Sequence, residues 1–522
     1  MTWIGTQQRH HSAPIILPIG FWQNEFWQNN GGQNDGIRRR DLNAMKTPIG
    51  PRCPGRLSLP HSRRELLAAS ANGFGMLALS GLLAQETRAA QPSDAGTFSP
   101  HLPTKAKHVV FLFMDGGVSH VDSFDPKSKL DELDGKPFLE SKNPTANGNR
   151  QWLKSPWPFR KCGDSGMPIS SLFPHIAEHA DDLAVIRSMK ADLPIHSTGV
   201  LFLHTGSNNA GRPSIGSWVN YGLGCESRNL PGFVVLSFGV VPCGGLENYS
   251  SGFLPANQQA TLLNADGVPL DNLTPADTNA RILQAKLALL RGQDEAFSKT
   301  LGVDDAVESA IKNYEMAYRM QSLVPDVLDL SRETDATQKM YGLDSKVPSQ
   351  RLYGIQCLRA RRLIESGVRF VEINCPPGAS NGTWDQHGNL KAGHEKNALD
   401  TDQAIGGLIT DLKQRGLFDE TLIVWAGEFG RTPHSSGRDG RDHHPEGFSV
   451  WLAGGGVRGG TIYGATDELG MHSVENICTM HDLHATILHL MGLDHERLTF
   501  RFAGRDFRLT DVHGNVVREV LS

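Results

Sequence analysis

The sequence has no apolar run long enough to span a membrane and remain there. Its most apolar stretch, between Leu66 and Ala84, is short and rich in glycine and alanine, whereas a membrane helix needs about 20 predominantly apolar residues. Basic charge is not in excess either, because 51 Lys and Arg residues face 56 Asp and Glu residues, for a net charge of -5. We therefore expect neither an integral membrane protein nor a nucleic-acid-binding one.

Cysteine is sparse, with seven in 522 residues, and no two of them form a CxxC pair. A structural zinc knuckle is therefore not expected, and a chain of this length does not need disulfides to fold. One or two disulfide bridges could still form, but the spacing does not indicate which cysteines would pair. The absence of an internal repeat disfavours a solenoid or a propeller.

The first 90 residues differ in composition from the rest of the chain. Residues 1–44 are rich in Asn, Gln, Gly and Trp, and we expect them to be a mis-called extension, with Met45 as the true initiator, or a disordered leader. Residues 45–90 contain SRRELLAASANGFGMLALSGLLAQ, which resembles a twin-arginine export signal built on Arg63 and Arg64. The alternative is a buried core helix. An export signal implies passage through the twin-arginine translocase and a periplasmic or extracellular bacterial location.

Helices that lead into apolar strands recur along the remaining chain. A strand at His108 to Met114 opens the folded part, and the pairs RLYGIQCLRARRLIESG with VRFVEIN and KNALDTDQAIGGLITDLKQRG with TLIVWAG follow. This alternation predicts an α/β fold with a central, mostly parallel sheet covered by helices on both faces. We expect one domain over residues 101–500 with a helical insertion at about 277–350. A C-terminal hairpin is predicted over 501–522, turning at His513, Gly514 and Asn515.

Acidic and histidine residues follow the apolar strands. Ligands at the carboxyl ends of strands are the usual construction of a site in an open α/β sheet. The imidazoles of His443 and His444 suit zinc, iron or manganese better than calcium, although calcium stays among the possible metals. The alternatives to a metal site are that Asp115 caps a turn or helix, that Asp385 and His387 in WDQHGN are a surface pair, and that Glu428 forms an ion pair with Arg431. We predict a divalent metal site whose ligands are Asp115, Asp385, His387, Glu428 and His443.

The order of these motifs resembles the alkaline phosphatase and sulfatase superfamily, and most closely its branch known as the DUF1501 family. The resemblance covers nearly everything from Arg63 to the end and is carried by SRRELL, HTGSNNAGRPSIGSWVNYGLG, GEFGRTPHSSG, GRDHHP and HDLHATILHLMGLDHERLTFRFAGRDFRL. It implies an alkaline phosphatase/sulfatase-like fold and metal-assisted hydrolysis of sulfate or phosphate esters.

The nucleophile position departs from the superfamily pattern. Sulfatases carry a Cys in a CxPSR segment, converted to formylglycine, nine residues before a Thr-Gly; counting back nine from Thr205 reaches His196, and no CxPSR occurs. No formylglycine is therefore expected. Either a metal-activated Ser197 or Thr198 attacks, or a metal-bound water does so with His196 as ligand or base. PIHSTG also fits a helix start capped by Ser197 or Thr198, where an anion binds favourably.

Two further features bear on the site. Glu428 in GEFG lacks the adjoining His of the superfamily's second metal position, so one metal is better supplied than two. Arg431, Arg438 and Arg441 could grip a sulfate or phosphate group bidentately, or belong to a solvated loop that balances nearby carboxylates. We interpret His481, His484 and His489 mainly as packing and capping groups. The alternative is that His481 or Asp482 reaches the site.

The sequence thus predicts an exported metal-dependent hydrolase with His196 and Ser197 at the catalytic position. Its substrate would be a small ester or a sulfated or phosphorylated glycan. The alternative is a non-catalytic sulfatase-fold protein that binds a glycan or a cell-envelope partner.

Overall fold

The computed structural model describes residues 99–139, 149–266, 269–270, 280–301, 305–377, 383–437 and 439–522. The predicted extension of residues 1–44, the predicted export signal within residues 45–90 and Arg438 lie outside the described residues. Within the described ranges, no helix has the length and apolar character that a membrane crossing requires.

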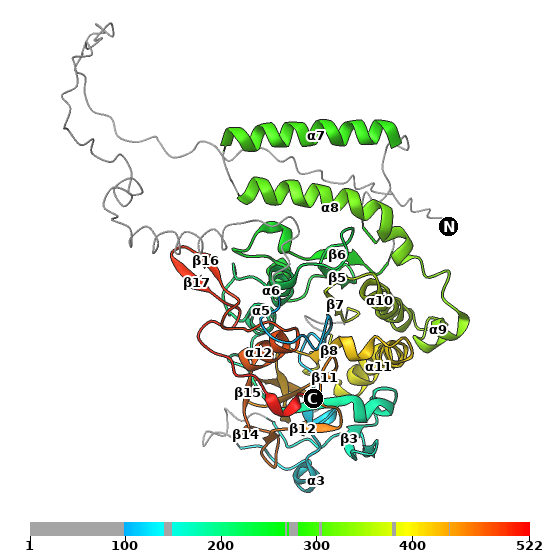
Figure 1. The fold of residues 1–522 in the computed structure, drawn as a ribbon. Helices are drawn as coiled ribbons and strands as arrows, with labels where there is room; N and C mark the ends of the chain where they lie inside the picture. The colour runs from blue at the N-terminus through cyan, green and yellow to red at the C-terminus, as the bar shows by residue number, and fades with distance from the viewer. Residues whose placement is uncertain are drawn as a thin grey trace, which may run out of the picture. The chain divides into compact units, whose positions relative to one another are not determined.

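A nine-stranded sheet lies at the centre of this part of the chain, in the order β12-β4-β11-β8-β1-β7-β5-β6, with β15 also paired to β4 (Figure 1). Strands β8, β1, β7, β5 and β6 are mutually parallel, whereas β11 is antiparallel to both of its neighbours. The predicted mostly parallel α/β sheet is confirmed. Its strands are β1 (His108–Phe113), β4 (Leu183–Lys190), β5 (Phe233–Ser237), β6 (Thr261–Asn264), β7 (Phe370–Asn374), β8 (Thr421–Ala426), β11 (Phe448–Gly454), β12 (Thr461–Tyr463) and β15 (Cys478–Thr479).

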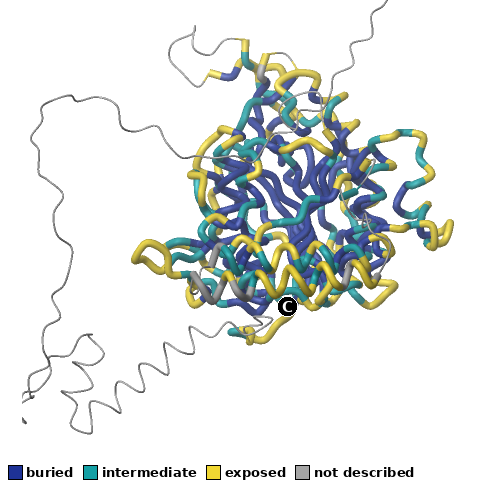
Figure 2. Tube along the Cα trace, turned by 90° about the horizontal axis from the view of Figure 1, so that it is seen from above, coloured by how far each residue is buried: buried dark blue, intermediate teal, exposed yellow. Residues whose placement is uncertain are grey.

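Helices cover both faces of the sheet, which explains why its strands are apolar throughout. All six residues of β1 are buried; Val110 and Leu112 join the core beneath α10 and α11, while Val109 and Phe111 join the core beneath α5, α6 and α12. The resulting buried layer runs through the middle of the fold (Figure 2). These helices are α5 (His196–Thr205), α6 (Ile215–Leu223), α10 (Pro348–Glu365), α11 (Leu390–Gln414) and α12 (Met480–Leu490).

Between β6 and β7 the chain forms the helices α7, α8 and α9, whose bounds are Ala280–Leu301, Asp305–Leu328 and Asp335–Met340. The remaining short elements are α3 (Ser128–Leu133), η1 (His120–Asp122), η2 (Ile176–Asp182), η3 (Gly245–Tyr249), η4 (Ala256–Gln258), η5 (Phe418–Glu420) and η6 (Arg518–Val520).

Short two-stranded ribbons lie outside the central sheet. The ribbon of β9 (Gly430–Ser436) and β10 (Gly440–His444) connects β8 to β11 and carries part of the site described below. The others pair β2 (Phe159–Cys162) with β3 (Met167–Ser170), β13 (Ala465–Thr466) with β14 (Ser473–Glu475), and β16 (Phe500–Phe502) with β17 (Arg505–Phe507).

The C-terminal hairpin turns earlier than predicted. Its strands are β16 and β17, and the predicted turn at His513 to Asn515 does not form. The backbone of this last segment bonds elsewhere: Asn515 N donates to Asp482 Oδ1 and Val517 N to Thr486 Oγ1, both on α12. Anchoring to a helix has taken the place of strand pairing.

The six described cysteines are free thiols: Cys162, Cys225, Cys243, Cys357, Cys375 and Cys478. The fold is therefore held by its core and its hydrogen bonds in this part of the chain.

Candidate metal centre

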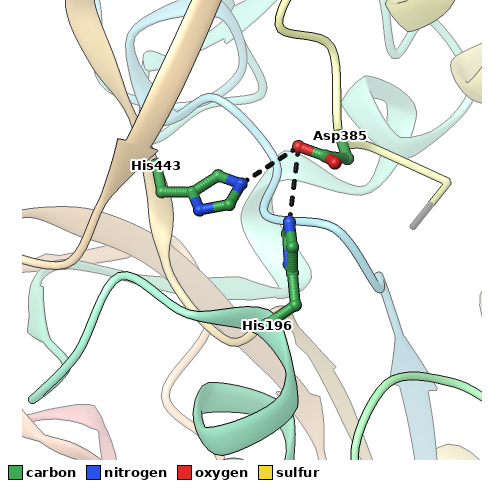
Figure 3. A group of neighbouring side chains, drawn as sticks. All are labelled: His196, Asp385 and His443. Atoms are coloured by element: carbon green, nitrogen blue, oxygen red, sulfur yellow. Dashed lines mark hydrogen bonds and ion pairs between the residues drawn. The ribbon is translucent and has the colours of Figure 1, made fainter. Parts of the chain in front are cut away.

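Three side chains from distant parts of the sequence meet at the carboxyl-terminal edge of the sheet (Figure 3). His196 begins α5 after β4, Asp385 follows β7, and His443 lies in β10 after β8. One ligand atom of each lies within 4.8 Å of those of the other two. His196 Nε2 is 3.3 Å and His443 Nε2 is 3.2 Å from the same oxygen, Asp385 Oδ1.

The Nδ1 atoms of these two imidazoles each make a hydrogen bond. His196 Nδ1 donates to Glu428 Oε1 at 2.6 Å, and His443 Nδ1 donates to the Pro194 carbonyl at 2.8 Å. In the neutral rings the Nε2 lone pairs therefore face Asp385 Oδ1. Lone pairs directed at a carboxylate oxygen repel it unless a proton or a metal ion lies between them, and ring orientation by an outer oxygen is typical of metal-binding histidines.

His387 has the same arrangement on the exposed side of the site. Its Nδ1 donates to Asp442 Oδ1 at 3.0 Å, and its Nε2 lies 3.1 Å from Asp385 Oδ1. The side chain is 45% exposed, against 9% for that of Asp385. His387 therefore stands where solvent or a ligand would reach the other groups. Asp442 in turn pairs with Arg150 at 2.9 Å.

Asp115 and Glu428, both predicted as ligands, lie outside the compact group of three. Glu428 is fully buried and contacts His196 on Nδ1, the nitrogen that faces away from Asp385; its carboxylate also accepts from Gly116 N at 3.0 Å. Glu428 therefore contacts the His196 ring on the side away from Asp385, and its role as a direct metal ligand stays a prediction. The alternative ion pair with Arg431 is wrong, because that guanidinium bonds to Asp385.

Asp115 follows β1 in the predicted sharp turn, where Gly116 and Gly117 have φ values of 101° and 78°. A Cβ on Gly117 would lie 2.9 Å from the Phe429 carbonyl oxygen, so the turn needs glycine there. Asp115 Oδ1 is buried with no hydrogen-bond partner among the described residues. Burial, and next the negative charge of Glu428, raise the pKa of Asp115 to about 7.

The charges of the central group are strongly perturbed. Burial opposes the charged form of His196, but the carboxylates Asp385 and Glu428 outweigh it and raise the pKa to about 9. Burial also opposes the charged form of Asp385, yet His196, His443 and Arg431 hold its pKa far below the ordinary value. Without a metal, protons take up the role of the cation between these groups.

Two of the three arginines predicted to grip an anion are fully buried, which overturns that role for them. Arg431 donates to Asp385 Oδ1 at 2.6 Å and to the carbonyls of Gly116, Gly117 and Arg441. Arg441 donates to Asp122 Oδ2 at 2.7 Å and to the carbonyls of Thr432 and Leu153. Their donors are directed to the protein, and neither forms a solvated loop.

Helix α5 starts without a side-chain cap. Its N-cap residue is Ile195, so the predicted capping by Ser197 or Thr198 is wrong. Thr198 Oγ1 donates to the Ile195 carbonyl at 3.2 Å. Ser197 is exposed, directly after His196 in the first turn. A helix start of this kind directs backbone N–H groups outward, which favours an anion.

Three other histidines near the motifs make hydrogen bonds to the backbone and lie outside the candidate metal centre. His444 is buried and contacts the Met471 carbonyl, because successive residues of a strand point to opposite sides. His481 and His484 bond to the carbonyls of Gly206 and Leu203. Asp482 forms a capping box with Thr479, in agreement with the packing and capping interpretation.

The donor set fits a transition metal. Two imidazole nitrogens and one carboxylate oxygen, with a third imidazole beside them, match sites for zinc, iron or manganese. His196 Nε2 is buried and faces Asp385 Oδ1 at 3.3 Å. In the neutral ring its lone pair is available to a metal ion, as such a site requires.

Sequence reasoning missed the outer partners. Glu428 as the support of His196, Asp442 as the support of His387, and the pairing of Arg431 with Asp385 were not foreseen. The available signal was the high charge density of GEFGRTP and GRDHHP, but spacing alone does not show which charges meet.

The fold and the site together define an α/β protein with a candidate metal centre at the carboxyl ends of its parallel strands. Over residues 106–521 the chain matches the family described as protein of unknown function (DUF1501), and it belongs to that family. No curated protein matches the chain.

Solved structures show distant likeness. The lipoteichoic acid synthase LtaP from Listeria monocytogenes is 8% identical, with 82% of this chain and 80% of that chain covered and a TM-score of 0.34. The PsFucS1 sulfatase from Pseudoalteromonas sp. is 13% identical, with 81% and 72% covered and a TM-score of 0.32. A protein in the alkaline phosphatase superfamily from Vibrio parahaemolyticus is 12% identical, with 77% and 72% covered and a TM-score of 0.32. Likeness at this level carries no argument about chemistry or substrate.

Proposed function

We propose that this protein is an exported, metal-dependent hydrolase of sulfate or phosphate esters. The observation that carries the proposal is the arrangement around Asp385 Oδ1, with the Nε2 atoms of His196, His443 and His387 at 3.3, 3.2 and 3.1 Å. The motif order that resembles the alkaline phosphatase and sulfatase superfamily supports the same chemistry.

In this proposal His196, Asp385 and His443 hold the ion, and His387 completes the group on the exposed side. A bound zinc, manganese or iron ion would supply Lewis-acid activation of the ester. Glu428 keeps the His196 ring in the orientation that directs Nε2 to the site. Pro194 does the same for His443 through its carbonyl oxygen.

Ser197 is the candidate nucleophile among the hydroxyl groups of PIHSTG, because it is exposed beside His196 whereas the Thr198 hydroxyl donates to its own helix start. The N-terminal N–H groups of α5 would stabilise negative charge on the reacting group. If water attacks instead of Ser197, the same N–H groups retain that role.

Substrate and location belong to the proposal as well. A small ester or a sulfated or phosphorylated glycan is expected, reached outside the cytoplasm after passage through the twin-arginine translocase. The support is the SRRELL segment and the apolar run that follows it. Replacement of Arg63 and Arg64 by Lys should retain the protein in the cytoplasm, as cell fractionation would show.

The deciding experiment combines metal analysis with ester hydrolysis. The full chain, loaded in turn with zinc, manganese and iron, is expected to retain a metal and to hydrolyse an aryl sulfate, an aryl phosphate or an aryl phosphodiester. His196→Asn should lose both metal and activity. Ser197→Ala should lose activity alone if Ser197 attacks, with Thr198→Ala as the neighbouring control.

A second candidate function rests on one observation: His196 occupies the position where sulfatases carry their Cys. A chain that binds metal firmly but hydrolyses none of the three ester classes would favour a non-catalytic protein that binds a glycan or a cell-envelope partner. A chain that cannot retain any of the metals would exclude the hydrolase.

A further inference from the structure

Two loops follow strand ends at the edge of the sheet that carries the candidate metal centre. Residues 191–195 join β4 to α5, and residues 238–244 join β5 to η3. β5 is parallel to β7, and β7 is parallel to β1 and thus to β8. β4 runs in the same direction as β8, because both are antiparallel to β11. Both loops therefore lie at the carboxyl-terminal edge, where His196 and Asp385 meet.

Five large apolar side chains in and beside these loops are exposed, over 39% to 61% of their surface. They are Leu193, Ile195, Val240, Val241 and Leu246, and we call them the apolar rim. Single exposed apolar residues are normal on a protein surface. A group of them beside a polar site instead marks a surface that a ligand or a partner covers.

The apolar rim borders the candidate centre through both loops. In the first loop, Ile195 is the N-cap residue of α5. After the second loop, η3 packs against α5. The pKa of the Cys243 thiol, in the second loop, is raised by burial and next by the negative charges of three carboxylates near the centre, Glu428, Asp115 and Asp385. The second loop therefore lies close enough to the centre to share its electrostatic field.

The two loops offer no positive charge to an anionic polymer. Residues 191–197 and 238–246 contain no Lys or Arg, and their one carboxylate is Asp192. Beside the exposed His387, Arg150 is already paired with Asp442 at 2.9 Å. The hydroxyl groups and charges of a sulfated or phosphorylated glycan need hydrogen-bonding partners and cations when they leave water. An uncharged aliphatic group needs neither, and its transfer out of water is favourable.

We propose that the apolar rim binds the organic group of the ester, so that the site accepts sulfate or phosphate monoesters of aliphatic alcohols in preference to esters of sugars. The inference rests on the proposed function, because it names the substrate class of the same site. The anionic group would bind at the metal centre and the first turn of α5, and the aliphatic chain would lie on the rim.

The first test is a binding series on the unmodified full chain loaded with zinc. A fully buried methylene group increases affinity about fourfold, so about twofold is expected on an open rim that leaves half of the aliphatic chain in water. In calorimetry, hexyl sulfate should accordingly bind about 30-fold more tightly than methyl sulfate. Glucose-6-sulfate, which carries the same charge on a polar group, should bind no more tightly than methyl sulfate.

The outcomes separate this inference from the proposed function. Equal affinity for methyl and hexyl sulfate, no binding of either, or tighter binding of glucose-6-sulfate than of hexyl sulfate would overturn the inference and leave a metal-dependent hydrolase standing. A chain that retains no zinc would overturn the proposed function and the inference with it. The series measures binding, so it depends neither on turnover nor on the folding of a variant.

Variants of the rim show where the aliphatic chain lies. Leu246→Gln combined with Val241→Thr should reduce the ratio of hexyl to methyl sulfate affinity at least about threefold, because apolar surface is removed while the candidate metal ligands stay in place. Leu399→Gln is the matched control, since Leu399 is also an exposed leucine but lies on α11, which covers the other face of the sheet. A ratio that falls equally in the control, or that does not fall in the rim variant, would show that the hexyl group binds elsewhere and would contradict the inference.

Discussion

Glu428 Oε1 lies 2.6 Å from His196 Nδ1, on the side of the ring opposite Asp385. The buried carboxylate fixes which nitrogen of His196 carries the proton and which one faces the site. Glu428 therefore acts on the site through His196.

Substitution of Glu428 by Gln should lower metal affinity by about 10- to 100-fold, which is typical of the loss of an outer partner of a ligand histidine. Titration calorimetry with zinc measures it. Glu372→Gln is the matched control, because Glu372 also holds a buried histidine, His204 at 2.9 Å. That control should affect stability and leave metal affinity unchanged; an equal loss in both variants would contradict the role of Glu428.

His443 and His387 should differ in their contribution to metal binding. His443→Ala removes a member of the compact group, so zinc affinity should fall by more than about 100-fold, beyond the loss expected from an outer partner. His387→Ala should cost less, since its side chain is 45% exposed and outside that group. A larger loss of zinc affinity for His387→Ala than for His443→Ala in calorimetry would contradict this prediction and identify His387 as the more important ligand.

Much of the fold could be predicted because it depends on local patterns. The strand before Asp115 and the strand before Glu428 are continuous apolar runs, as burial on both faces requires, and each helix before a strand shows its period in the sequence. The C-terminal turn could not be predicted, because Asn515 bonds to Asp482 on another element.

The candidate site could be predicted only in part, because some of its contacts also join distant parts of the chain. Asp385, His387 and His443 could be chosen by residue type and by their place after strands, and the structure brings them together. The burial of Arg431 and Arg441 could not be predicted in this way, because their carboxylate partners, Asp385 and Asp122, lie 46 and 319 residues away in sequence. Periodicity carries no information on such pairs.

The metal-free protein should lose stability as the pH rises through about 9. The pKa of His196 is raised from 6.5 to about 9 in the fold, so bound protons stabilise the fold fully below pH 6.5 and this contribution disappears above pH 9. Asp115, with its pKa raised from 3.8 to about 7, acts in the same direction at lower pH, because its contribution is lost between pH 3.8 and 7. Thermal unfolding in chelator across this range measures the loss.

His196→Gln should flatten that profile near pH 9, and zinc should do the same by replacing the proton. Zinc affinity should accordingly increase with pH up to about 9, because the metal competes with the proton on His196. A zinc affinity that does not change between pH 6.5 and 9 would show that His196 is not a ligand.

The buried pair of Asp122 and Arg441 should matter for stability more than any surface pair. Both side chains are fully buried and 2.7 Å apart, so Asp122→Asn leaves an unpaired buried guanidinium and should cost about 3–5 kcal/mol. Asp134→Asn is the control, since its pair with Lys154 is 34% and 51% exposed and should change stability by about 1 kcal/mol or less. Denaturant unfolding compares the two, and equal losses would contradict the prediction.

Strands β8 and β11 are antiparallel neighbours, so a tight turn would suffice to join them. The chain instead inserts the β9–β10 ribbon there, with Arg431 at its start and His443 near its end. The ribbon thereby places the Arg431 guanidinium and the His443 imidazole at the site, although the pairing of β8 with β11 does not require such a ribbon. A change in the length or sequence of this ribbon would therefore alter the candidate metal centre without changing the register of the strands beneath it.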